Sequence, residues 1–359
     1  MKKARLSYLT FALLVMVSML LASCQAAATT APTEPVAAET EAVEPTTPPA
    51  EPTAVVEPTA APTEAPTAAP AVEMGTEANP IVMAIAPSAT TDELIANGDA
   101  IAKLLSDETG LVIKAVVPTN YKAMIEAMAS GNAQIGWLAP FGYLVAHETM
   151  VTDAAGAEVP AADVAFISLR NGADHYATQF IGQASQFTAG TDISALQQFA
   201  DKKPCWTDPF SASGYVIPAS LLAQEGVKTK TAAFVQGHPT VVRAVYAGGI
   251  CDFGATYVDA RTNSAIVEDM PDVNDKVIVV YQTEPIIPND TISYAYDLPQ
   301  ELRDKITAGF EAIAATEEGA AAMKGLYEID GIKPVDDTFF DEFRVLLAAS
   351  GIDIASLVK

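Results

Sequence analysis

The sequence has few of the residues that build metal sites and nucleic-acid interfaces. Its 359 residues include only three cysteines and three histidines. None of the cysteines forms a Cys-x-x-Cys pair, which rules out zinc ribbons. The low number of histidines rules out most histidine-based metal sites. Basic residues are scarce too, since 20 lysines and arginines stand against 45 aspartates and glutamates, for a formal net charge of −25. This acidity argues against a nucleic-acid partner, and we expect no metal and no cofactor.

The N-terminal residues 1–23 have the pattern of a secretory signal. A basic start is followed by an apolar run that is shorter than the roughly 20 residues of a membrane-spanning helix. The run ends in Leu-Ala-Ser-Cys, which resembles the bacterial lipobox and implies that Cys24 is lipidated and becomes the mature N-terminus. The alternative is an ordinary signal with a chance cysteine. We therefore expect an exported protein that is lipid-anchored at the outer face of the cell membrane.

Residues 24–78 are expected to form a disordered spacer behind the lipidated cysteine. From Gln25 to Ala78 the chain holds ten prolines, nine glutamates and no basic residue. Such a segment has too little bulky apolar surface to offset the entropy of ordering it. It therefore reads as a semi-extended stalk that repels itself.

The rest of the chain alternates between strand and helix patterns and suggests two α/β lobes. Half of all residues are hydrophobic, so sizeable cores are available. The segment 79–148 reads as βαβαβα, which predicts a parallel sheet covered on both faces. A second set of strand patterns runs from 176 to 282, and the tail 298–359 looks helical without a sheet of its own. We assign 79–176 plus 285–359 to lobe 1 and 177–284 to lobe 2, with two crossovers as a hinge.

Two cysteines remain once Cys24 is assigned to lipidation. Cys205 and Cys251 both lie in strand-like segments of the second lobe. An exported protein works in an oxidising compartment, so we predict a disulfide between them. Two buried free thiols are the alternative.

The most informative stretch is Thr-Asp-Pro-Phe-Ser-Ala-Ser-Gly-Tyr at 207–215, which follows a strand pattern and opens a helix. Small hydroxyl residues and glycine at a helix start leave N–H groups that favour an anion. Alternatively, Ser211 or Ser213 only caps the helix. Two further segments, which carry His238 and Tyr257, follow or end strands in the same way, and ligands of open α/β sheets sit at such strand ends.

Residues 79–310 resemble the periplasmic phosphonate/phosphite/phosphate-binding proteins of ABC importers. The matching segments are Asn120-Tyr121 with Ile125-Glu126, Gly-Trp-Leu-Ala-Pro-Phe at 136–141, the Asp-Pro-x-Ser-x-Ser-Gly-Tyr run, Gly237-His238, Ala-Thr-Tyr at 255–257 and Ile-Pro-Asn-Asp at 287–290. The resemblance implies a class II periplasmic-binding-protein fold, in which two α/β lobes joined by a two-crossover hinge clamp an oxyanion.

The resemblance also implies roles for single residues. Ser211, Ser213 and His238 would hold the phosphorus oxygens, Tyr121 would contribute from the first lobe, and Asp290 would face the ligand from the second crossover. Trp137 and Tyr257 complete the candidate ligand set, although for Trp137 core packing is the slightly favoured interpretation. The family run usually has threonine where this chain has Ala212, which removes one hydroxyl donor and leaves the preferred oxyanion open.

The candidate site contains no arginine or lysine, so we expect binding through directed donors. A carboxylate such as Asp290 tolerates an oxyanion only when a proton lies between them, which selects a protonated ligand and disfavours sulfate. Capping or pinning of the crossover is the alternative role for Asp290. His147 and His175 are expected to be surface or packing histidines.

These features predict a monomeric solute-binding lipoprotein that captures phosphonate, phosphite or phosphate and delivers it to ABC permease and ATPase subunits. The alternatives are a binder of another small molecule with the same fold, a ligand-sensing receptor, and a periplasmic hydrolase. The hydrolase is disfavoured, because Ser213 lies in Ser-Ala-Ser-Gly and not in a Gly-x-Ser-x-Gly elbow, so no enzyme is expected.

Overall fold

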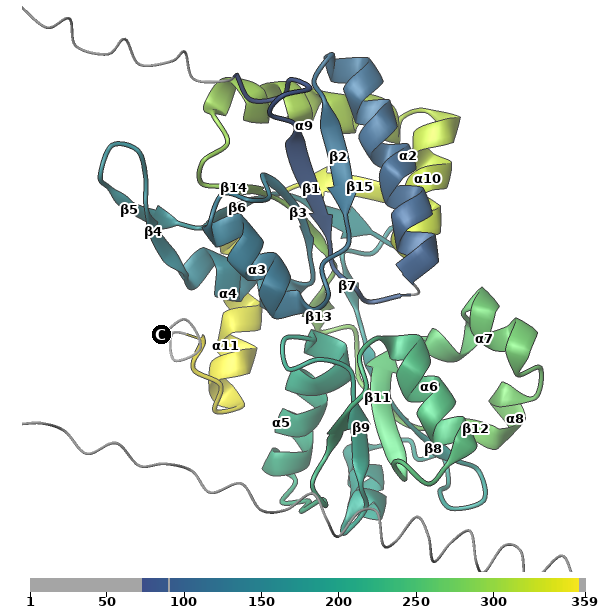
Figure 1. The fold of residues 1–359 in the computed structure, drawn as a ribbon. Helices are drawn as coiled ribbons and strands as arrows, with labels where there is room; N and C mark the ends of the chain where they lie inside the picture. The colour runs from purple at the N-terminus through teal and green to yellow at the C-terminus, as the bar shows by residue number, and fades with distance from the viewer. Residues whose placement is uncertain (1–72, 90, 355–359) are drawn as a thin grey trace, which may run out of the picture. The chain divides into compact units, whose positions relative to one another are not determined.

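A computed structural model describes residues 73–89 and 91–354 of the chain (Figure 1). All of them belong to one compact unit, Ala68–Lys359. The expected signal, the lipidation at Cys24 and most of the expected spacer lie outside the described residues. Within the described ranges, no helix combines the length and the apolar character needed to cross a membrane.

Six strands form the first sheet, in the order β15-β6-β14-β3-β1-β2. Strands β1, β2 and β3 are parallel as predicted, but β14, β6 and β15 add antiparallel pairs, so the sheet is mixed. The parallel pairing expected for 79–148 is confirmed, and strands from outside that segment make the whole sheet mixed. The tail also supplies the edge strand β15, which its helical pattern did not indicate. The strands are β1 (Ile81–Ile85), β2 (Ile113–Val116), β3 (Ile135–Leu138), β6 (Ala162–Leu169), β14 (Thr291–Ala295) and β15 (Gly331–Pro334).

Helices cover both faces of this sheet and form a core cluster with each face. One cluster packs α3, α4 and α11 on the sheet, and the other packs α2, α9 and α10 (Figure 1). Local signals begin several of these helices: Asn120 caps α3 by accepting from the Ala123 N–H, and Pro140 opens α4. The helices are α2 (Thr91–Thr109), α3 (Tyr121–Ala129), α4 (Pro140–Glu148), α9 (Gln300–Ala314), α10 (Glu317–Tyr327) and α11 (Asp341–Ala349).

The second sheet has five strands in the order β10-β9-β11-β8-β12. Its strands are β8 (Thr178–Gln183), β9 (Pro204–Trp206), β10 (Ala233–Phe234), β11 (Phe253–Tyr257) and β12 (Val277–Gln282). Strands β10 and β11 pair in parallel with β9, whereas β8 runs antiparallel to β11 and β12. All five strands fall within the range expected for lobe 2.

The helices that pack on the second sheet are short. They are α5 (Ile217–Gln224), α6 (His238–Ala247), α7 (Ser264–Asp269) and α8 (Val273–Lys276), with 3-10 helices Ile193–Phe199 and Ala260–Thr262 and a π-turn Ala212–Val216. Another 3-10 helix, Asp337–Phe340, precedes α11 in the first lobe.

The disulfide between Cys205 and Cys251 is confirmed, with a Cα–Cα distance of 5.5 Å. Cys205 lies in β9 and Cys251 lies two residues before β11, the strand that pairs with β9. The bond therefore ties together the starts of two strands whose opposite ends lead to candidate site residues.

Two crossovers connect the sheets. Strand β7 (His175–Tyr176) follows β6, β13 (Ile287–Pro288) precedes β14, and the two pair antiparallel as a small sheet of their own (Figure 1). A further hairpin, β4 (Met150–Thr152) with β5 (Glu158–Pro160), projects from the first lobe.

Six of the residues that we assigned to the spacer belong to the first lobe. Residues 73–78, which we assigned to the spacer, form a turn in which the Gly75 N–H donates to Asn79 O at 2.8 Å. The Gly75 carbonyl accepts from the Val112 N–H at 2.8 Å, next to the start of β2. These hydrogen bonds extend the edge of the first lobe and order the segment.

Candidate ligand-binding site

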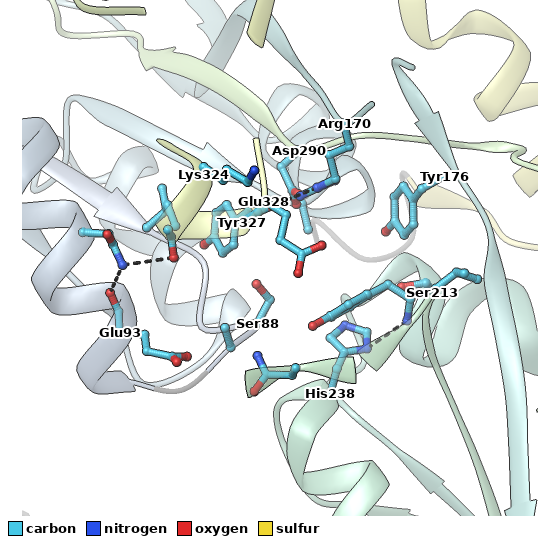
Figure 2. A pocket seen from close by; sticks show the side chains of 18 of the residues that line it. Ser88, Glu93, Arg170, Tyr176, Ser213, His238, Asp290, Lys324, Tyr327 and Glu328 are labelled. Carbon is cyan, nitrogen blue, oxygen red and sulfur yellow. Dashed lines mark hydrogen bonds and ion pairs between the residues drawn. The ribbon is translucent and has the colours of Figure 1, made fainter. Parts of the chain in front are cut away.

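A pocket of about 480 Å³ lies where loops from both sheets and both crossovers meet (Figure 2). Ser88 and Ala139 follow β1 and β3 of the first sheet, while Ser211 and His238 follow β9 and β10 of the second. The pocket therefore sits outside the carboxyl ends of parallel strands, where open α/β sheets bind ligands. Six of the seven residues expected to bind ligand line it: Tyr121, Ser211, Ser213, His238, Tyr257 and Asp290.

Trp137 is the seventh, and it does not line the pocket; the core position weighed against a ligand role is confirmed. Its side chain is fully buried in the core of the first lobe, where its Nε1–H donates to Met83 Sδ at 3.2 Å. The indole also meets Phe310 edge-on, with ring centroids 5.9 Å apart. All four residues of β3 are buried, so both faces of this central strand carry core side chains.

The two serines of the 207–215 run differ in their hydrogen bonds. Ser211 caps the π-turn, because its Oγ accepts from the Gly214 N–H at 3.2 Å, which leaves its own proton free to be donated. Ser213 is 1% exposed, and its Oγ has no hydrogen-bond partner among the described residues. It lies near the Tyr176 hydroxyl, without the geometry of a hydrogen bond. Burial raises the pKa of Tyr176, and Ser213 acts in the opposite direction with a smaller effect.

Glycine at 214 allows this turn to pack against the strand that precedes it. A Cβ added to Gly214 would lie 2.0 Å from Thr207 Oγ1. No other residue can occupy that space unless the turn moves, so Gly214 fixes where Ser211 and Ser213 lie.

His238 is the first residue of α6 and is 3% exposed. The Tyr257 N–H donates to its Nδ1 at 3.3 Å, so in the neutral ring the proton is on Nε2. Burial, with a smaller contribution from the charge of Arg170, lowers the pKa of His238 to about 3. The ring is therefore an uncharged donor at neutral pH.

Four tyrosines line the same pocket: Tyr121, Tyr176, Tyr257 and Tyr327. Burial raises the pKa of each phenol above its ordinary value, so all four stay protonated. The Tyr327 hydroxyl donates to Ala86 O and is committed to the protein. Protonated phenols add to the hydroxyl character of the site without adding charge.

Arg170 corrects the expectation of a site without arginine or lysine. It follows β6, lines the pocket and forms an ion pair with Asp290 through Nη2. Burial lowers the pKa of Arg170, but the neighbouring Asp290 carboxylate outweighs this effect and the pKa is raised overall. The sequence signal for this residue is weak. A strand-like run precedes Arg170, and the turn dipeptide Asn171-Gly172 follows it.

Other charged side chains of the first lobe also line the pocket and were not expected. Lys324 and Glu328 come from the end of α10, and Glu93 comes from the first turn of α2. The Ser264 Oγ donates to Glu93 Oε1 at 3.3 Å, and the His238 N–H donates to Ser88 O at 3.4 Å. These two contacts join residues of the first lobe to residues of the second across the pocket.

The other two histidines do not line the pocket. His175 pairs with the Asp174 carboxylate at 2.8 Å, and His147 Nδ1 lies 3.0 Å from Ala162 O. No group of three or more histidine, cysteine or acidic side chains that could hold a metal ion occurs within 73–89 and 91–354. Besides the charged groups of Glu93, Lys324 and Glu328, the site offers hydroxyls, a neutral imidazole N–H and one ion pair, and these donors suit an oxyanion.

Comparison with known proteins gives the same picture. The family model described as "ABC transporter, phosphonate, periplasmic substrate-binding protein" matches residues 83–340, more than half of the chain. The phosphate-import protein PhnD of Mycolicibacterium smegmatis is 27% identical over 289 residues, covering 76% of this chain and 86% of that protein.

Two solved structures show the same fold. PhnD1 from Prochlorococcus marinus, in complex with methylphosphonate, aligns with a TM-score of 0.64 at 14% identity, over 76% of this chain and 98% of that one. The binding protein of an ABC phosphonate transporter from Pseudomonas aeruginosa aligns with a TM-score of 0.63 at 18% identity, over 76% and 86%. The expected periplasmic-binding-protein fold is confirmed, and the chain belongs to the family of exported substrate-binding proteins of phosphonate ABC transporters.

Proposed function

We propose that this chain captures one phosphonate, phosphite or phosphate ion in the pocket and delivers it to an ABC importer. The observation that carries the proposal is the Ser213 hydroxyl, which is buried without a hydrogen-bond partner and lines the pocket. Leaving a buried hydroxyl unpaired costs about 1–3 kcal/mol. A ligand oxygen at this position would relieve that cost.

Neighbouring donors support an anionic oxygen as the missing acceptor. Ser211 retains its hydroxyl proton, and His238 carries its proton on Nε2. Hydroxyl and imidazole donors would each meet a different oxygen of a tetrahedral anion. Hydrogen bonds to a charged group contribute more than neutral ones, about 1.5–3 kcal/mol each. Asp290 would accept from a protonated oxygen of the same ligand.

The pocket has room for an organic substituent on phosphorus. Its 480 Å³ is within the range of about 300–1,000 Å³ typical of small-molecule sites. This volume is compatible with an organic phosphonate as well as with the bare anions.

The remaining parts of the proposal come from the sequence. Residues 1–23 would direct export, Cys24 would carry the lipid, and the spacer would let the binding domain reach the permease from the outer face of the membrane. The chain would act as a monomer and without catalytic turnover.

Isothermal titration of the purified chain tests the ligand class. Phosphite, methylphosphonate, 2-aminoethylphosphonate and phosphate are compared with sulfate, and we expect one ligand per chain for at least one phosphorus anion and weaker binding of sulfate. Flat titrations with all four would contradict the proposal. A phosphate-ester assay accompanies them, and turnover that Ser213→Ala abolishes would favour a hydrolase instead.

A matched pair of serine variants locates the site. Ser213→Ala should weaken binding by about ten-fold or more, since it removes a donor to a charged group. Ser220→Ala is the control, because Ser220 is also buried but donates to Val216 O within the start of α5 and does not line the pocket. Equal affinity in both variants would remove Ser213 from the site.

A further inference from the structure

The ion pair between Arg170 and Asp290 lies at one end of the paired strands β6 and β14 of the first sheet. Arg170 directly follows β6, and Asp290 directly precedes β14, its antiparallel partner. The Ser168 N–H donates to Asp290 O at 2.9 Å, which fixes the two ends side by side. The pair therefore stands where the first crossover leaves the first sheet and the second returns to it.

Arg170 is held by the protein on three sides. Its Nε donates to Tyr327 O at 2.7 Å, its Nη1 to Asn289 Oδ1 at 3.2 Å, and its Nη2 to Asp290 Oδ2. Asn289 is fixed in turn, because its amide donates to Ser168 O at 2.9 Å and to Ala173 O at 2.8 Å. The guanidinium thus keeps one position while it lines the pocket.

Carboxylates outnumber cations among the residues that line the pocket, and Arg170 compensates one of them. Three carboxylates line the pocket against two cations, namely Glu93, Asp290 and Glu328 against Arg170 and Lys324. In Figure 2, Arg170 and Asp290 lie together across the pocket from Ser213 and His238. The influence of Arg170 reaches that side, since its charge contributes to lowering the pKa of His238. Without Arg170, an anion beside the serines would face Asp290 as an uncompensated carboxylate.

We propose that Arg170 is a specificity-determining residue, which by pairing with Asp290 makes this end of the pocket neutral and so sets the charge of the oxyanion that is accepted. The inference rests on the proposed function. Asp290 alone would repel every anion that brings no proton, and Arg170 alone would attract any anion, sulfate included. The pair instead admits a singly charged oxyanion whose protonated oxygen donates to Asp290 Oδ1, because Oδ2 is used by the arginine.

A double-mutant cycle tests the pair. Dissociation constants for methylphosphonate and sulfate are measured by calorimetry for the full chain and for Arg170→Gln, Asp290→Asn and the double variant. The pH is mildly acidic, so that methylphosphonate is mainly singly charged and sulfate doubly charged. Arg243→Gln and Asp269→Asn are the matched controls, since this exposed ion pair of 2.7 Å does not line the pocket.

Each variant has a distinct expected result. Asp290→Asn exposes the arginine charge and should strengthen sulfate binding by about ten-fold or more. Arg170→Gln leaves the carboxylate bare and should weaken both ligands by about ten-fold or more. The double variant is neutral again and should bind methylphosphonate more tightly than Arg170→Gln. The two control variants should leave the ratio of the two constants unchanged.

Several outcomes would overturn the inference. One is an unchanged ratio of the methylphosphonate and sulfate dissociation constants in Asp290→Asn. Another is a change in the binding free energy of methylphosphonate in the double variant that equals the sum of the changes in the two single variants. If Arg170→Gln does not fold, Arg170→Lys replaces it: retention of the wild-type ratio supports the charge role, and a ratio as altered as in Asp290→Asn contradicts it. A wild-type chain that binds no phosphorus anion overturns the proposed function as well, whereas normal wild-type binding with additive variants overturns this inference alone.

Discussion

Replacing His238 tests how the pocket would hold an anion. His238→Ala removes the Nε2–H donor that the Tyr257 N–H sets in place by binding Nδ1. A hydrogen bond from a buried donor to a charged group contributes about 1.5–3 kcal/mol, so the dissociation constant should rise about 10- to 150-fold. His238→Gln keeps an N–H donor in the side chain and should lose less affinity.

The same position makes a prediction about stability that needs no ligand. His238 takes up a proton near pH 3 in the folded chain, against an ordinary value of 6.5 that applies when the chain is unfolded. Between these values the unfolded state binds more protons, so lowering the pH destabilises the fold, by up to about 1.4 kcal/mol per pH unit. His238→Gln removes this contribution, so the variant should gain stability relative to wild type as the pH falls below about 6.5.

Urea unfolding of the ligand-free chain at a series of pH values measures this difference, and calorimetry measures the affinities. The reasoning is refuted if wild type and His238→Gln lose stability in parallel below about pH 6.5. It is also refuted if wild-type affinity, relative to the variant, rises as the pH falls through that value. Either result would mean that the imidazole is charged when it meets the ligand.

Three further predictions concern the scaffold. Gly214→Ala should lower the melting temperature and abolish binding, since the added Cβ would lie 2.0 Å from Thr207 Oγ1; an unchanged titration would contradict the tight turn. Trp137→Ala should cost about 3–5 kcal/mol of unfolding free energy in a urea titration, with the folded fraction retaining its affinity, because the indole lies in the core. Reduction of the Cys205–Cys251 bond, which closes a separation of 46 residues, should cost about 4 kcal/mol by the loop-entropy relation, and a melting temperature unchanged by reductant would argue against it.

The parts of the fold that the sequence predicted depend on short-range patterns. Strands β1 to β3 are short apolar runs, each followed by a helix, and such runs can be recognised without knowing their partners. Ser211, Ser213 and His238 were singled out in the same way, because each follows a strand and opens a helix or turn, whereas their ligand roles came from the family resemblance. Local order along the chain was enough to bring them to one edge of the second sheet.

The parts that were missed depend on long-range pairing. Strand β6 is placed in the sheet by antiparallel pairing with β14, more than a hundred residues further on. The same pairing brings Arg170 next to Asp290. The short edge strand β15 likewise exists because β6 offers it a partner. Trp137 was included among the candidate ligand residues because it lies in a segment that carries the family resemblance, but both faces of the buried strand β3 pack in the core.

The most direct test of the ligand site is a crystal structure of the chain with methylphosphonate. We expect the phosphonate group between the two lobes, with oxygens about 2.7–3.2 Å from Ser213 Oγ and His238 Nε2 and the methyl group toward the open space of the pocket. A phosphonate group bound beside Glu93 and away from Ser213 and His238, or bound outside the pocket, would contradict the account.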